Sequence, residues 1–199
     1  MGENMRKAHI ERKTSETDIV LDINLDGSGK TEIATGIGFF DHMLNSFARH
    51  GFFDLSCRVK GDLHVDCHHT IEDTGIVLGQ AIARALGEKK GIRRFGNFFL
   101  PMDETLVMCA IDLSGRPFLV CDLPFTVERV GEFDTEMVRE FFYAVSYGAA
   151  MNLHLKLMFG SNNHHIMEAA FKAFAKALDE AVSHDPRLHD VLSTKGSLI

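Results

Sequence analysis

The spacing of hydrophobic residues in the first half of the chain predicts strands and helices in a definite order. Apolar and polar residues alternate over 18–24, which is typical of a half-buried strand. A glycine-containing turn and a second short run follow, so the pattern predicts a hairpin over 18–35. The apolar spacing becomes helical over 39–50, alternates again over 55–59, and is helical once more over 68–86.

The second half of the chain repeats this order. Residues 104–112 enclose a continuous apolar run, which predicts a strand buried on both faces, and residues 118–123 return after a turn. Helical spacing covers 135–150, alternation covers 151–157, and a long helix is predicted over 163–182. A mostly polar tail ends the chain.

Short motifs repeat along with the elements. Two phrases recur in the same order, Asp-x-Ser-Gly-Lys/Arg at 26–30 and 112–116, and His-His-x-x-Glu at 68–72 and 164–168. We therefore predict an internally duplicated α+β fold, in which sheets pack against helices. The two halves, 1–92 and 93–199, are expected to form one compact unit.

Composition narrows the class of protein. With 199 residues, 45% of them hydrophobic, the chain is long enough for an ordinary globular core. A net charge of −7 makes a nucleic-acid partner improbable, although a local basic site can still bind a small anion. Residues 1–13 lack the apolar core of a signal peptide, and no apolar run approaches membrane-spanning length. The four cysteines form no Cys-x-x-Cys pair, so we expect reduced thiols in a cytoplasmic protein.

The two His-His-x-x-Glu motifs are the main chemical signal. Successive helix residues point about 100° apart, whereas residues three or four apart share a face. One ion therefore cannot easily take both imidazoles of a pair, and the simplest arrangement has two ions, each taking one histidine of a pair. Further donors lie on the preceding helices, in equivalent places. The candidate metal ligands are His42, His68, His69, Glu72, Glu140, His164, His165 and Glu168.

The type of ligand restricts the metal and leaves several functions open. Mixed imidazole and carboxylate donors suit Mn, Fe or Zn, and the lack of cysteine in the motifs argues against a structural zinc site. Such a site fits a di-metal enzyme, for example a hydrolase in which a metal-bound water attacks, and it also fits a non-enzymatic metal-binding shell.

Four segments together closely resemble the imidazoleglycerol-phosphate dehydratase family of histidine biosynthesis: Phe39-Phe-Asp-His-Met-Leu44, His68-His-Thr-Ile-Glu-Asp73, Gly91-Ile-Arg-Arg-Phe-Gly96, and Asn163-His-His-Ile-Met-Glu168 with Phe171-Lys-Ala-Phe174. The resemblance covers about residues 11–195. It implies a lyase with two Mn²⁺ per active site at subunit contacts, and a homo-oligomer of 24 subunits built from trimers. All the candidate ligands above match family ligands except Glu140, which stands where many members have a histidine.

The resemblance also implies a small phosphorylated imidazole as substrate, over which the C-terminal tail closes. The residues that match the family's phosphate positions are Arg94, Arg116, Ser193, Thr194 and Lys195. Arginine suits a phosphate because its planar guanidinium offers two parallel donors.

The expected reaction is loss of water from the diol of D-erythro-imidazoleglycerol phosphate. The C2 hydrogen is not acidic, so simple removal by a base would be slow. If manganese binds a ring nitrogen and favours the imidazolate, electrons from the ring can expel the C3 hydroxyl. A carboxylate then takes the C2 proton, and the enol becomes the ketone, imidazole-acetol phosphate. We expect Glu16 and Glu168 to be the catalytic carboxylates, with Glu16, which matches a substrate-contact position, as the base.

Overall fold

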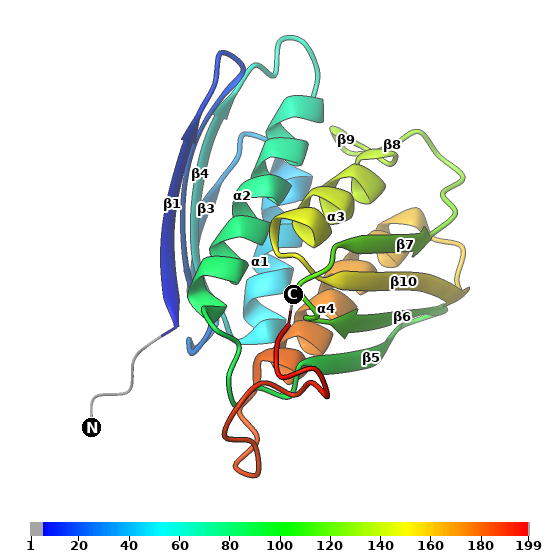
Figure 1. The fold of residues 1–199 in the computed structure, drawn as a ribbon. Helices are drawn as coiled ribbons and strands as arrows, with labels where there is room; N and C mark the ends of the chain where they lie inside the picture. Colours follow the sequence, from blue (N-terminus) through cyan, green and yellow to red (C-terminus); the bar gives the residue numbers. More distant parts are fainter. Residues whose placement is uncertain (1–5, 199) are drawn as a thin grey trace.

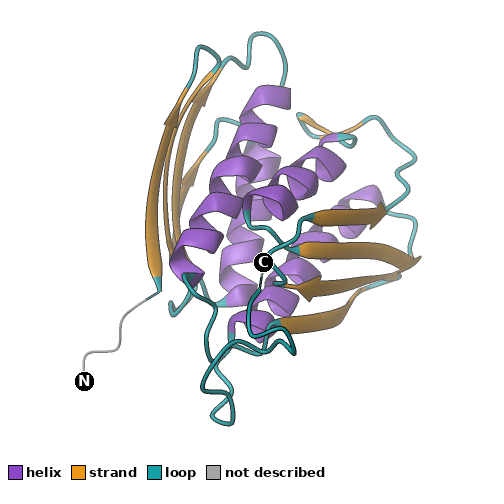
Figure 2. Cartoon of the chain, viewed as in Figure 1, coloured by secondary structure: helices purple, strands orange, loops and turns teal. Residues whose placement is uncertain are grey.

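The computed structural model describes residues 6–198, so residues 1–5 and Ile199 of the two expected halves lie outside the described residues. Two four-stranded sheets form the outer layers, and two pairs of helices lie between them (Figures 1 and 2). Helices α1 and α2 cover the first sheet, α3 and α4 cover the second, and the pairs pack against each other as α1 with α4 and α2 with α3. The α+β class is confirmed.

The first half of the chain forms a sheet in the order β1-β2-β4-β3. Its elements are β1 (Lys7–Lys13), β2 (Thr17–Asn24), β3 (Thr31–Ala34), α1 (Gly38–Gly51), β4 (Asp54–Gly61) and α2 (His68–Leu86). Strand β3 is parallel to β4, and the other neighbours are antiparallel.

The second half forms a sheet of the same pattern, β5-β6-β10-β7, in which β7 is parallel to β10. Its elements are β5 (Phe95–Met102), β6 (Thr105–Asp112), β7 (Phe118–Asp122), β8 (Arg129–Val130), β9 (Phe133–Asp134), α3 (Met137–Gly148), β10 (Asn152–Phe159) and α4 (Asn163–Val182). The short strands β8 and β9 pair with each other. The two halves therefore share one connectivity.

The helices agree with the predicted ranges, but the predicted strand pairing was wrong. Residues 18–35 do not form a hairpin, because β2 and β3 lie on opposite sides of β4. The return at 118–123 likewise pairs with β10 and not with the strand before it. The true hairpins are β1–β2 and β5–β6, whose first strands the periodicity did not reveal. In β1 only Ala8 is buried, so its alternation is faint.

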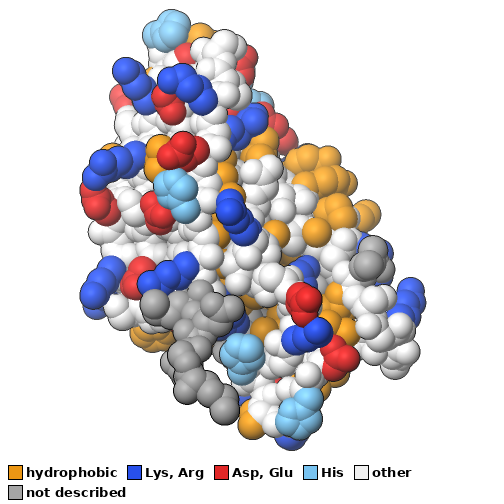
Figure 3. Space-filling view, turned by 60° about the vertical axis from the view of Figure 1, so that its left-hand side comes forward, with side chains coloured by type: hydrophobic (Ala, Val, Ile, Leu, Met, Phe, Trp, Pro, Cys, Tyr) orange, Lys and Arg blue, Asp and Glu red, His pale blue; other side chains and the backbone are white. Residues whose placement is uncertain are grey.

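The outer faces of the two sheets differ in polarity. Charged side chains cover the outside of the first sheet (Figure 3), where Lys7, His9 and Glu11 alternate with inward residues. On the second sheet Phe95, Phe99 and Phe118 are each half or more exposed. Strand β6 was expected to be buried on both faces, yet alternate residues are only half-buried because this outer face is open. No helix among residues 6–198 is long and apolar enough to cross a membrane.

Helices α2 and α3 touch through their backbones. A Cβ atom at Gly79 would lie 2.6 Å from the carbonyl oxygen of Val145 and 2.9 Å from the Cα atom of Gly148. Real carbon atoms do not approach so closely, so glycine is required where the two helices cross. This close crossing sets the position of α2, which carries the first histidine pair.

We expect Gly79→Ala to destabilise the fold, although alanine favours a helix by about 1 kcal/mol over glycine. The added methyl must push α2 and α3 apart, and overpacking of this kind costs about 1–3 kcal/mol of unfolding free energy. The measurement is urea unfolding of the metal-free protein at fixed protein concentration. Gly38→Ala is the control, because no heavy atom lies within 4 Å of a Cβ there. Equal midpoints for the two variants would contradict the backbone contact.

Candidate active site

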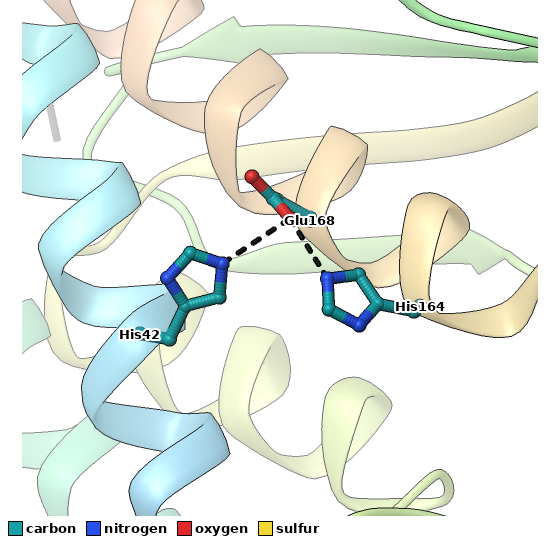
Figure 4. Close-up of side chains that lie close together, drawn as sticks. All are labelled: His42, His164 and Glu168. Carbon is teal, nitrogen blue, oxygen red and sulfur yellow. Dashed lines mark hydrogen bonds and ion pairs between the residues drawn. The ribbon is translucent and has the colours of Figure 1, made fainter.

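One group of metal-ligand type converges within the described chain. The ligand atoms of His42, His164 and Glu168 all lie within 4.8 Å of one another. Glu168 Oε2 is 3.2 Å from His42 Nε2 and 3.0 Å from His164 Nε2, so both rings point at one carboxylate oxygen (Figure 4). Two imidazole nitrogens and a carboxylate oxygen form a donor set that suits Mn, Fe or Zn.

The packing of α1 against α4 creates this group. His164 and Glu168 lie four residues apart on one face of α4, and His42 approaches from α1. Aromatic contacts hold the two helices side by side: the ring of Phe39 lies 5.1 Å from the ring of His164, and Phe47 stacks on Phe174 at 5.3 Å. A histidine of the first half therefore meets the motif of the second half.

The two histidines of each pair face different partners, as consecutive helix positions require. The rings of His164 and His165 are inclined by 86° with their centres 6.1 Å apart. His164 faces Glu168 within the helix, whereas His165 Nδ1 lies 2.8 Å from Glu104 Oε2. The two imidazoles of the pair therefore face different carboxylates, an arrangement that the two-ion prediction requires.

Glu168 is a buried carboxylate with partners on both oxygens. Lys172, one turn later on α4, lies 2.7 Å from its Oε1 atom, while Oε2 faces the two imidazoles. Burial raises the pKa of Glu168, but the hydrogen bonds from Lys172, His164 and His42 outweigh it and lower the pKa to about 2. The carboxylate is therefore ionised and oriented before any ligand binds.

The first His-His-x-x-Glu motif has a looser geometry. His68 Nε2 lies 3.8 Å from Glu72 Oε2, one turn along α2. The Nδ1 atom of His69 hydrogen-bonds to Asp62, and hydrogen bonding to Asp62 is the main cause that raises the pKa of His69. Its Nε2 atom lies 3.7 Å from Glu16 Oε1, so the candidate base lies beside this motif in the same chain.

The turn that carries Glu16 is anchored to α2. Thr14 Oγ1 accepts hydrogen bonds from the backbone amides of Glu16 and Thr17, which closes the β1–β2 turn. Thr17 Oγ1 and Arg12 then donate to the two oxygens of Asp73, which is buried and directly follows the motif. The sequence motifs did not indicate a role for Asp73, although an acidic residue on the apolar side of a helix needs a partner.

Glu140 does not join a convergent group. It lies on α3, which packs against α2, and its carboxylate contacts the neighbouring Arg139 at 3.6 Å. Within residues 6–198, Glu140 does not form a three-ligand group with His68 and Glu72. Its role as a ligand stays a prediction.

Glu104, like Asp73, is a candidate functional residue that the sequence motifs did not indicate. Its Oε1 atom accepts hydrogen bonds from the amides of Ser161 and Asn162, at the start of α4, while Oε2 faces His165. Hydrogen bonding from His165 and Asn162 lowers the pKa of Glu104 to about 2. A signal was present, because the phrase Glu-Thr opens both β2 and β6, at 16–17 and at 104–105.

All five predicted phosphate residues line one cavity of about 510 Å³ at the C-terminal tail. Its lining comprises Arg94, Ser114, Arg116, Val191, Leu192, Ser193, Thr194, Lys195, Ser197 and Leu198. Arg94 binds both carboxylate oxygens of Asp112 and donates to the carbonyl oxygen of Leu192. Two of its five N–H groups stay free for an anion, and its fixed guanidinium holds the tail in place.

This basic cavity and the histidine motifs lie at opposite ends of the helices. The amide of Arg94 donates to the carbonyl of Ala181, near the C-terminus of α4. His164 is at the other end of that helix, about 25 Å away at 1.5 Å per residue. The first motif is equally remote, because it begins α2, and the segment after α2 reaches the cavity region where Lys89 contacts Leu113.

Comparison with known proteins gives one consistent family. The family model of imidazoleglycerol-phosphate dehydratase matches residues 35–178. Imidazoleglycerol-phosphate dehydratases of Lachnoclostridium phytofermentans and Acetivibrio thermocellus are 69% and 61% identical over 193 residues, which cover 97% of this chain and 98% and 99% of theirs. The Staphylococcus aureus enzyme structure has a TM-score of 0.82 at 39% identity, covering 90% of this chain and 99% of its own. The Pyrococcus furiosus structure gives 0.83 at 37%, covering 95% and 100%.

We expect Lys172→Met to lower the stability of the metal-free protein near neutral pH by about 2 kcal/mol, because Glu168 loses a charged hydrogen-bond donor. The folded-state pKa of Glu168 is lowered, so its stabilisation is present above the unfolded pKa and disappears as pH falls towards about 2. The difference between wild type and variant should therefore shrink between about pH 4 and pH 2. Urea unfolding across this range measures it. Lys176→Met, which removes a more exposed pair with Asp179, should show a smaller difference. A constant difference at all pH values would exclude Glu168 as the cause.

Proposed function

The chain belongs to the imidazoleglycerol-phosphate dehydratase family, and we propose that it dehydrates D-erythro-imidazoleglycerol phosphate to imidazole-acetol phosphate at a site holding two Mn²⁺ ions. The family is one of enzymes of histidine biosynthesis, of the lyase class. Membership favours a lyase over the two alternatives that the sequence left open, a di-metal hydrolase and a non-enzymatic shell. The observation that carries the proposal is the convergence of His42, His164 and Glu168 from segments 126 residues apart.

The residues present fit a manganese ion. One ion would be held by His42, His164 and Glu168, whose donors already face a common point. The remaining candidate ligands would complete the coordination of the two ions once the subunits assemble. They are His68, His69, Glu72 and His165, and also Glu140, which has the least structural support. When bound, the metals supply Lewis acidity that favours the deprotonated form of the substrate ring, the imidazolate, and so promotes loss of the C3 hydroxyl.

Glu16 is proposed as the base that takes the C2 proton. Its side chain is about half exposed, and Oε1 lies 3.7 Å from His69 Nε2, so it borders the metal motif and remains accessible to substrate. The anchored turn limits the movement of Glu16, so this carboxylate would stay within reach of the C2 atom of a bound substrate. Glu168 contributes to catalysis by holding the metal between two imidazoles.

The basic cavity is proposed to bind the phosphate group. Arg116 and Lys195 bring positive charge to it, and the hydroxyl groups of Ser193 and Thr194 add donors. The bond from Arg94 to the carbonyl of Leu192 keeps the tail beside the cavity. A tail held in this way favours closure over a bound substrate.

We propose that each active site is shared between subunits of a homo-oligomer, 24 subunits built from trimers, in the cytoplasm. The three-carbon chain between the imidazole and the phosphate spans less than about 10 Å even when extended. The basic cavity lies about 25 Å from His164 along α4, so one chain cannot bring both to a single substrate. The exposed aromatic side chains of the second sheet supply an apolar surface for association.

The direct test is an assay of ketone formation from the diol phosphate. We expect metal-stripped enzyme to be inactive and Mn²⁺ to restore turnover. Glu16→Gln should retain wild-type metal content and assembly but lose at least about a hundredfold in kcat, because general base catalysis is worth that much. A Glu16→Gln enzyme with near wild-type kcat would remove Glu16 from the role of base. Full activity without any divalent metal would overturn the proposal as a whole.

Sharing of the site between subunits can be tested by mixing two inactive variants. Lys195→Ala impairs the cavity, and His164→Ala impairs the metal centre, so each homo-oligomer should turn over poorly. If the two regions come from different chains, dissociation and co-assembly should create some sites with both regions intact, and activity should reappear. The control is the mixture of His164→Ala with His42→Ala, which lie in one group and should show no rescue. No rescue in the first mixture would mean that both regions serve a site in one chain.

A further inference from the structure

The Nδ1 atom of His165 is occupied by a carboxylate. It lies 2.8 Å from Glu104 Oε2. An ionised carboxylate only accepts hydrogen bonds, so the proton sits on Nδ1 and is donated to Glu104. In a neutral imidazole the other nitrogen, Nε2, then carries a free lone pair. Asp103 Oδ2 lies 3.9 Å from that nitrogen, too far for a hydrogen bond.

Glu104 is itself held firmly. Its other oxygen, Oε1, accepts hydrogen bonds from the amides of Asn162 and Ser161, at 2.9 and 3.3 Å, and from the hydroxyl of Thr105 at 3.0 Å. Thr105 is the first residue of β6, and Ser161 and Asn162 belong to the segment that leads into α4. Both oxygens are thus committed, and the carboxylate cannot turn away from His165 without losing several partners. An isolated ion pair at the surface, without further hydrogen bonds to its carboxylate, lacks such constraints.

We propose that Glu104 is a positioning residue for His165: it fixes the neutral ring in the tautomer that leaves Nε2 unprotonated, and so prepares that atom to bind a metal ion. The inference rests on the proposed function in one respect, namely that His165 is a metal ligand. Carboxylates that orient metal-binding histidines commonly contribute about ten- to a hundredfold in metal affinity.

Glu16, the equivalent residue of the first half, contacts its histidine differently. Glu16 and Glu104 each occupy the tight turn of the first hairpin of their half, and each directly precedes a buried threonine that opens the next strand. Glu16 is near His69, the second histidine of its pair, but on the Nε2 side and at 3.7 Å. Glu16 therefore does not orient the ring through Nδ1, and its side chain remains about half exposed.

Asp62 takes over the orienting role in the first half. It follows β4 directly, and its two oxygens lie 3.0 and 3.2 Å from His69 Nδ1. Both His69 and His165 thus donate from Nδ1 to a carboxylate and present Nε2. Because Asp62 orients His69, the turn carboxylate Glu16 is free for catalysis, whereas Glu104 is fully engaged.

The substitution Glu104→Gln tests the proposal, because it should change which nitrogen of His165 carries the proton. The glutamine carbonyl can still accept from the amides of Ser161 and Asn162, and its NH₂ group then faces His165 Nδ1. Because NH₂ only donates there, the ring must accept at Nδ1 and carry its proton on Nε2. The opposite orientation would place NH₂ against two backbone N–H donors. We therefore expect the variant to change the tautomer with little change in fold.

Two measurements decide the matter. Solid-state nitrogen NMR of histidine-labelled, metal-free protein at about pH 8 reads the tautomer of His165, whose signal is identified by its loss in His165→Gln. Manganese titration followed by electron paramagnetic resonance of the free ion gives the affinity. We expect Glu104→Gln to move the proton to Nε2 and to weaken Mn²⁺ binding at least about tenfold. Asp62→Asn should do the same at His69.

Glu16→Gln is the matched control, because it alters the equivalent residue: it should leave the tautomer and the affinity unchanged while turnover falls. Glu104→Asp, which keeps the carboxylate, should retain the wild-type tautomer. The proposal is overturned if the proton of His165 keeps its position in Glu104→Gln. It is also overturned if the tautomer changes and the variant still binds Mn²⁺ with wild-type affinity. If the wild-type protein neither binds Mn²⁺ nor forms ketone, the proposed function fails, and the tautomer of the metal-free protein still decides whether Glu104 orients His165.

Discussion

Two imidazoles on consecutive helix residues cannot face the same point, and the architecture of this protein follows from that constraint. In each His-His pair the first ring turns to the glutamate one turn along its own helix. The second ring turns outward, where a carboxylate from the strand side of the same half meets it. The second partner of each pair thus comes from outside its helix, and the four-layer packing places one sheet beside each pair (Figure 1).

Buried charge couples the chemistry to the fold. Glu168 is ionised inside the protein because Lys172 and two imidazoles surround it, and the buried carboxylate of Asp73 accepts hydrogen bonds from Arg12 and Thr17. Each carboxylate ties a helix that carries a histidine motif to another part of the structure. The candidate metal ligands and the candidate base are thus held by the same contacts that hold the elements together.

The sequence predicted the helices and the family better than the arrangement of the strands. A 3.6-residue period identifies a helix from its own residues, so the ranges of α2 and α4 were predictable. Strand pairing depends on residues far away, and β1, with one buried side chain, carries almost no periodic signal. The meeting of His42 with Glu168 depends on which helices pack, which no local pattern encodes. Glu104 shows a different failure, because the Glu-Thr phrase that the two halves share is too short to stand out in the sequence.

The placement of both histidine motifs at one end of their helices, with the basic cavity at the other end, has a consequence for heredity. In an assembly that shares its sites, each subunit contributes metal ligands to one reaction centre and anion-binding groups to another. A faulty allele would then damage centres whose remaining residues are encoded by the intact copy. A chain with one substitution would still spoil only one centre, so a cell carrying one faulty and one intact allele would lose function in proportion to gene dosage. Two faulty alleles with substitutions at opposite ends of the helices would complement each other, because some centres would draw each region from the chain in which it is intact.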